Sequence, residues 1–170
     1  MIAPSLVREI LQGYALPPMG IHGLPHWGRV LETGLRLAKQ TGANLQVVTL
    51  FSVFHDARRV NDIIDPGHGT RGAELAREMR SKHLTLTDDE FNLLELACAQ
   101  HTDGTTEGDV TVQTCWDADR LDLWRVMITP SPIYLCTPVA KETAIQRWAR
   151  ERSLSNFTPD FVEAEWLNKD

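Results

Sequence analysis

The chain has 170 residues, of which 42% are hydrophobic and 24% charged, and its formal net charge is −6. Length and composition are typical of one globular domain with a substantial core. The negative charge argues against a nucleic-acid polymer as partner, because such binding depends on clustered positive charge. A small phosphorylated ligand is compatible with the negative net charge, since binding it needs only a few local arginines.

Neither a membrane nor a secreted setting is expected. No apolar run reaches transmembrane length, and the N-terminal residues lack the pattern of a signal peptide. Three widely spaced cysteines, Cys98, Cys115 and Cys136, fit neither a disulfide framework nor a paired-cysteine zinc site. We therefore expect a cytoplasmic protein.

The first half of the chain predicts helices and their ends. Pro25 suits the first turn of the second helix and Gly42 suits its end. The inner stripe of that helix begins with His26 and continues through Val30 and Leu37. Periodicity and turn residues together predict helices over residues 4–13, 25–40, 45–59 and 68–82.

The helix predicted over 45–59 is apolar for two turns and then ends in charged residues, which include His55 and Asp56. Burying an imidazole and a carboxylate is costly unless another group compensates them. A metal ion bound by both would do so, because metals bind deprotonated nitrogen and oxygen ligands together. The alternative is a His-Asp hydrogen bond at the end of a core helix, and the dipeptide alone favours that interpretation.

The second half of the chain also predicts helices and no strand pair. The sequence Thr87-Asp88-Asp89-Glu90 forms a capping box, and the inner stripe of the helix that it begins ends in His101. Thr137-Pro138 and Thr158-Pro159 each predict a helix start. The fold class is therefore all-α, as one domain over residues 1–170. The predicted segments are an extended loop over 105–114, helices over 115–127 and 137–151, and C-terminal helices within about 137–168.

Separate predicted helices thus carry ionisable side chains on apolar or partly apolar faces. His26 lies in His-Trp-Gly-Arg-Val, His55 adjoins Asp56, and Asp119 lies in Asp-Ala-Asp-Arg-Leu-Asp. This ordered pattern, over roughly residues 20–130, resembles the HD-domain superfamily of metal-dependent phosphohydrolases. The resemblance implies a helical bundle with a helical C-terminal extension. It also implies a metal site formed by His26, His55, Asp56 and Asp119, with Asp117 as the alternative to Asp119.

The sequence departs from the family pattern directly after the His-Asp pair. Many members continue with Ile-Gly, whereas this chain continues with Ala57-Arg58-Arg59. Subclasses defined by the longer motif, such as cyclic-dinucleotide phosphodiesterases, are therefore not favoured.

The mixed nitrogen and oxygen ligands suit a divalent ion, namely Mn, Fe, Co, Ni, Zn or Mg. Such an ion activates water for phosphate-ester hydrolysis. Arginines would then hold the phosphoryl oxygens, because a guanidinium pairs with phosphate bidentately. The structural alternative for each arginine is a solvated surface side chain. The candidates are Arg58, Arg59, Arg71 and Arg120.

Two further histidines have open roles. His68 lies in a turn-rich loop and His101 ends a core stripe. Either could protonate a leaving oxygen, or both could bind a second metal with Asp56 bridging. Their structural alternatives are a capping residue for His68 and a hydrogen-bonded core residue for His101. His22 is interpreted as structural rather than as an entrance residue. Tryptophans near the motifs could form a base-stacking pocket or simply belong to the core; they are Trp27, Trp116 and Trp124.

The resulting functional prediction is a metal-dependent phosphohydrolase acting on a small phosphorylated substrate, with a nucleotide as one candidate. A dinuclear-iron oxygenase, similar to inositol oxygenase, is the first alternative and requires both His68 and His101 as ligands. A non-catalytic HD domain that senses a ligand is the second alternative.

Overall fold

The computed structural model describes residues 2–167, and over that range it contains helices and no strand, which confirms the all-α prediction. Within the same range no helix is both long enough and apolar enough to cross a bilayer. The long helices are α1 (Pro4–Gln12), α2 (Leu24–Thr41), α3 (Leu45–Phe54), α4 (His68–His83), α5 (Asp88–Gln100), α6 (Val110–Arg120) and α7 (Thr143–Leu154). The short ones are η1 (Leu123–Val126), η2 (Pro132–Tyr134), η3 (Val139–Lys141) and η4 (Val162–Trp166).

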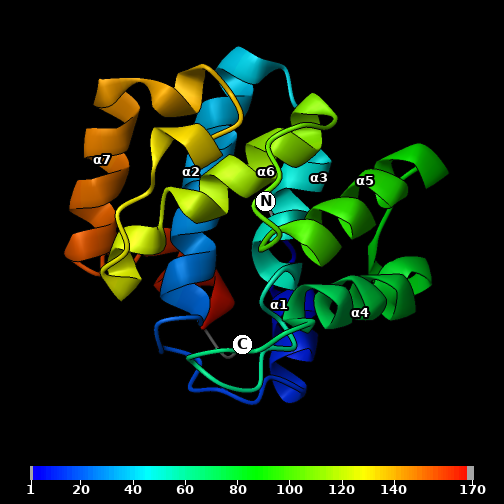
Figure 1. Ribbon diagram of the computed structural model, residues 1–170. Coiled ribbons are helices and arrows are strands. Elements are labelled where there is room, and N and C mark those ends of the chain that lie inside the picture. The colour runs from blue at the N-terminus through cyan, green and yellow to red at the C-terminus, as the bar shows by residue number, and fades with distance from the viewer. Residues whose placement is uncertain (1, 168–170) are drawn as a thin grey trace.

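Helix α2 is the central element of the bundle (Figure 1). It packs on α3 and α6, while α5 contacts α3, α4 and α6, and α7 lies on the far side of α2 from the α4–α5 pair. A Cβ added at Gly34 would lie only 2.6 Å from Val48 Cγ1, so α2 and α3 approach closely at that point. The site described below lies where these helices converge.

The predicted signals of α2 and α5 are confirmed. Pro25 lies in the first turn of α2, and Gly42 ends the helix in the left-handed conformation with φ of 74°. Thr87 and Glu90 form both hydrogen bonds of the capping box that starts α5. The inner stripes of both helices are buried as predicted, and His26 and His101 are buried with them.

The prediction of one helix over 45–59 is wrong at its C-terminal end. Helix α3 stops at Phe54, and the next residues form turns in which Ala57 N donates to Phe54 O and Arg59 N donates to Asp56 O. Two adjacent residues in a continuous helix project about 100° apart. His55 keeps helical backbone, with φ of −56° and ψ of −41°, and its side chain still meets that of Asp56, whose Oδ2 lies 3.9 Å from His55 Nε2.

The bounds of two helices predicted in the second half are also wrong. Helix α6 begins at Val110 rather than 115, because the Asp109 side chain caps it by accepting from Thr111 N. It ends at Arg120, and η1 follows as a separate turn. The helix predicted over 137–151 is divided into η3 and α7 at Glu142, which has extended backbone. The predicted final helix is present as η4, while position 168 lies outside the described residues.

Candidate metal centre

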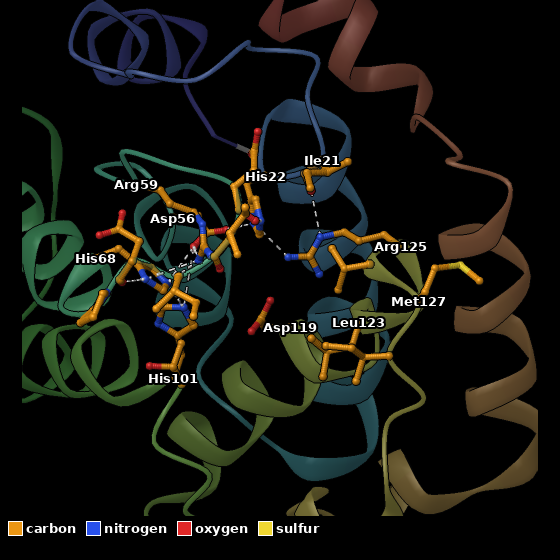
Figure 2. Close-up of a pocket in the computed structure, with 18 residues that line it drawn as sticks. Ile21, His22, Asp56, Arg59, His68, His101, Asp119, Leu123, Arg125 and Met127 are labelled. Carbon is orange, nitrogen blue, oxygen red and sulfur yellow. Dashed lines mark hydrogen bonds and ion pairs between the residues drawn. The ribbon is translucent and has the colours of Figure 1, made fainter.

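Asp56 lies at the centre of a cluster of buried histidines, and its side chain is 2% exposed (Figure 2). Its Oδ2 lies 3.6 Å from His26 Nε2 and 3.9 Å from His55 Nε2. Its Oδ1 lies 3.1 Å from His68 Nε2 and 3.8 Å from His101 Nε2. One carboxylate therefore faces two histidine pairs, one with each oxygen.

We call the first pair, together with Asp119, the inner half. His26 comes from the first turn of α2, His55 from the turn after α3, and Asp119 from the end of α6. The two Nε2 atoms are 3.0 Å apart, and Asp119 Oδ1 lies 3.4 Å from His26 Nε2 and 3.8 Å from His55 Nε2. Both imidazoles are 0% exposed.

We call His68 and His101 the outer half. His68 is the first residue of α4, and His101 directly follows α5. Their Nε2 atoms are 2.9 Å apart. The close packing of α4 on α5 and on the end of α3 sets this distance, since a Cβ at Gly69 would clash with the Cys98 carbonyl and one at Gly72 with the Phe54 carbonyl.

All four histidines are oriented in the same way, with Nδ1 against an oxygen that accepts hydrogen bonds. Because these oxygens only accept, each Nδ1 carries a proton, and each ring directs its Nε2 atom at the cluster. The acceptors are Asp122 Oδ2 for His26 (2.7 Å), Phe51 O for His55 (3.1 Å), Asp65 O for His68 (2.7 Å) and Cys98 O for His101 (2.7 Å).

Burial sets the charge of the inner histidines. It lowers the pKa of His26 to about 4 and that of His55 to about 3, so both rings are neutral at pH 7, as metal ligands must be. Burial also lowers the pKa of His101, but Asp56 and Asp119 outweigh it and raise that pKa. Burial alone would raise the pKa of Asp56, yet the surrounding histidines hold it well below its usual range.

A buried ion pair supports the inner half from behind. The carboxylate of Asp122 accepts from His26, and also from Arg29 Nε at 2.7 Å and Nη2 at 2.9 Å. A carboxylate in this position fixes the tautomer of a ligating histidine and increases its basicity. The sequence prediction missed Asp122 and Arg29, although Asp122 lies three residues after Asp119 and ends the same motif.

The cluster fits a metal ion on the chemistry of its donors. Two ligands bound at about 2.1 Å and at right angles lie about 3.0 Å apart, close to both Nε2 separations. Within residues 2–167, Asp56 Oδ1 is buried and accepts no hydrogen bond, despite its distance from His68. Two groups could each hold an ion: His26 with His55 and Asp56, and Asp56 with His68 and His101.

Asp119, rather than Asp117, is the aspartate of its motif that the structure places in this cluster. Asp117 instead accepts from Cys136 N at 2.7 Å, Thr137 N at 2.8 Å and Thr137 Oγ1 at 2.7 Å. It therefore anchors the 136–137 segment to α6. The ligand role of Asp119 stays a prediction.

A cavity of about 730 Å³ opens onto the cluster, and Asp56, His68, His101 and Asp119 line it. Arg59 borders it on the side of the outer half, with Nη1 3.6 Å from Asp56 Oδ1. Figure 2 shows Arg125 across the cavity, where it donates to the Ile21 carbonyl at 2.9 Å. The sequence prediction missed Arg125, because a single arginine after an apolar pair resembles any surface residue.

The other predicted arginines do not line this cavity. Arg58 donates to the Ile10 carbonyl near the end of α1 at 3.0 Å. Arg71 pairs with Asp65 at 2.6 Å and holds the loop before α4. Arg120 donates to the Tyr134 carbonyl at 2.6 Å and borders a smaller neighbouring cavity of about 400 Å³. Of the four candidates, the structure thus brings only Arg59 beside the cluster.

His22 contributes more than its structural interpretation suggested. Its Nδ1 lies 3.0 Å from Asp56 Oδ2, and it lines the cavity. By contrast, Trp27 and Trp116 are buried in the core, and Trp124 borders neither cavity. These tryptophans therefore form no base-stacking wall.

Comparison of the chain with protein-family models, with curated proteins and with solved structures gives no match. The helical fold and the buried histidine and aspartate cluster are therefore the features that indicate a function.

Proposed function

We propose that the protein is a metal-dependent phosphohydrolase acting on a small phosphorylated substrate. One observation carries this proposal: four histidines present their Nε2 atoms around Asp56, at the end of a cavity that two arginines border. His26, His55, Asp56 and Asp119 would hold the first ion. When bound, a divalent ion lowers the pKa of a water molecule and neutralises phosphate charge.

The chain's own residues supply the remaining functions. Arg59 and Arg125 would bind phosphoryl oxygens from two sides of the cavity, since a guanidinium pairs well with phosphate. His101 lines the cavity and would donate a proton to the leaving oxygen when one ion is bound. Its fellow outer histidine, His68, would orient it through the Nε2 contact of 2.9 Å.

The order of the motifs supports the same proposal. The helical fold, and a buried group of His26, His55 and Asp56 with Asp119 Oδ1 3.4 Å from His26 Nε2, are compatible with the HD-domain resemblance. The 730 Å³ of the cavity is within the range of pockets that enclose a small organic ligand.

The test combines metal analysis with phosphate release. Protein purified without chelator should contain at least one Mn, Fe, Co, Ni or Zn per chain. It should release phosphate from p-nitrophenyl phosphate, and a chelator should abolish that release. Asp56→Ala should lose both metal and activity, because it removes the carboxylate shared by both halves. Asp103→Ala, an exposed matched control, should keep both. Full turnover in Asp56→Ala, or after complete metal removal, would overturn the proposal.

A dinuclear-iron oxygenase is the second candidate, and the outer half favours it. Asp56, His68 and His101 form their own potential metal group directly beside the inner one. Two irons per chain, together with oxygen consumption and no phosphate release, would identify this activity. One or two non-iron ions with phosphate release would support the hydrolase.

A further inference from the structure

Large apolar side chains are strongly exposed around the mouth of the cavity. Among residues 2–167, Ile63 (85%), Met127 (84%) and Ile64 (77%) are the most exposed large hydrophobic residues, and all three line the cavity. Apolar residues grouped in this way commonly mark a site that binds an apolar surface. The exposed apolar residues at the mouth therefore indicate that a substrate entering this cavity has an apolar part.

These side chains lie on two separate segments that are held in place. Ile63 and Ile64 belong to the loop between α3 and α4, where Asp65 accepts from Val60 N at 2.7 Å and Arg71 at 2.6 Å. Met127 follows η1 with a φ of 61°, a left-handed conformation that costs a methionine stability. The backbone thus holds an exposed methionine at the mouth despite that cost.

The apolar wall continues from the mouth toward the metal centre. Figure 2 shows Leu123 and Met127 on the side of Arg125, across from His68 and Arg59. Ile21, Val126 and Ile128 also line this cavity. Of the described residues that line it, none is Phe, Tyr or Trp, so the imidazoles of the cluster are the rings that a nucleobase would meet there. The cavity thus combines a metal-ligating end, which Arg59 and Arg125 border, with an aliphatic mouth.

We propose that the cavity selects a phosphate monoester of an aliphatic alcohol, whose chain lies between Ile63 and Ile64 on one side and Met127 on the other. This inference rests on the proposed phosphohydrolase function, because it assigns the phosphate group to the metal centre and to Arg59 and Arg125. It replaces the nucleotide as the candidate substrate. An aliphatic chain in this place removes from water the apolar surface of both partners.

The first test measures binding without turnover. The probes are n-alkylphosphonates with two to eight carbons, titrated into the metal-loaded protein by calorimetry. We expect the affinity to rise about two- to fourfold per added methylene until the chain passes the mouth, because each buried methylene adds transfer free energy. The heat capacity of binding should become more negative along the series. An affinity independent of chain length would overturn the inference.

The second test uses variants of the mouth. In Ile63→Ser combined with Met127→Asn, the dependence on chain length should flatten, while the affinity for the two-carbon phosphonate should stay within about twofold. Asparagine tolerates the left-handed backbone at position 127, so this change should not disturb the fold. Leu154→Ser is the matched control, because Leu154 is 45% exposed and lines none of the described cavities.

Turnover then separates this inference from the proposed function. The hydrolase with an alkyl site should give kcat/KM values that increase from ethyl to hexyl phosphate and exceed those for nucleoside monophosphates. Hydrolysis that prefers nucleotides would overturn the inference and keep the hydrolase. Binding that depends on chain length, without phosphate release from any ester, would keep the alkyl site and overturn the hydrolase. Variants that change only self-association would make the mouth a contact between copies and overturn the inference.

Discussion

The inner and outer halves of the cluster each contain two histidines, but the surrounding structure holds the two pairs differently. His26 and His55 are 0% exposed, and Asp122 with Arg29 supports His26 from behind. His68 and His101 lie at helix ends, donate hydrogen bonds to backbone carbonyl oxygens and line the cavity. Asp56 lies between the halves, with Oδ2 facing the inner one and Oδ1 facing the outer one. We therefore expect the inner half to bind an ion more tightly and the outer half to meet the substrate.

The largest expected effect separates the two halves directly. His55→Ala should weaken the tightest bound ion by at least a thousandfold, because the variant removes a ligand from a preformed, buried site. His101→Ala should leave that ion bound and remove only a weaker second equivalent or the proton donor. Metal titration monitored by mass spectrometry under native conditions measures both. Equal losses in the two variants would mean that the halves are one undivided site.

The pH dependence of the metal-free protein should also distinguish the halves. In the folded state the pKa of His26 is about 4 and that of His55 about 3, below the unfolded value of about 6.5. As the pH falls from 7 to 4, the unfolded state therefore binds more protons, and stability decreases by roughly several kcal/mol. The raised pKa of His101 acts with the opposite sign, because its contribution is present at low pH and is lost as pH rises.

Denaturant unfolding of metal-free protein at a series of pH values measures this effect. His55→Gln should reduce the slope, because one of the two buried neutral rings is gone. Metal-loaded protein is the control and should unfold at a higher denaturant concentration at pH 7 than metal-free protein. Stability that is unchanged between pH 7 and pH 4 would contradict the assignment of neutral inner histidines.

Asp122→Asn tests the support behind the inner half. The amide leaves His26 in place but removes the negative charge that increases its basicity, and it leaves Arg29 without its ion-pair partner. We expect a 10- to 100-fold loss of metal affinity at the inner half. The outer half should be unaffected. Asp103→Asn, at an exposed turn, is the matched control. Unchanged affinity in Asp122→Asn would make this carboxylate purely structural.

The elements that the sequence predicted correctly have local signals. The capping box at Thr87 and the glycine at position 42 act on the backbone within one turn, so the ends of α5 and α2 could be read without a structure. The end of α3 could not. The apolar run contains no local signal for a helix end at Phe54, and the feature found there is a tertiary contact, the close approach of α4 to the Phe54 carbonyl at Gly72.

The residues of the candidate site likewise divide into those that have a local sequence signal and those that do not. His26 and the His55-Asp56 pair could be predicted because they lie in short motifs that follow one another in a set order along the chain. The contact between Asp122 and His26 joins residues 96 positions apart and has no local signature. Arginines are the hardest case, because a long side chain can reach in several directions. Sequence distance from Asp56 could not separate Arg58, which reaches α1, from Arg59, which reaches the cavity.

Substitution of Arg59 is expected to have the smallest effect of those predicted, and its neighbour Arg58 is the matched control. Arg59→Ala should raise KM for a phosphate ester about tenfold, because Arg59 Nη1 lies beside the outer half, 3.1 Å from His68 Nε2. Arg58→Ala should leave KM unchanged. It should instead lower the free energy of unfolding by about 1 kcal/mol, through loss of the hydrogen bond to the Ile10 carbonyl. Steady-state kinetics and denaturant unfolding on both variants measure these effects. A KM that rises equally in both variants would mean that general positive charge, rather than the position of Arg59 beside the outer half, draws the substrate in.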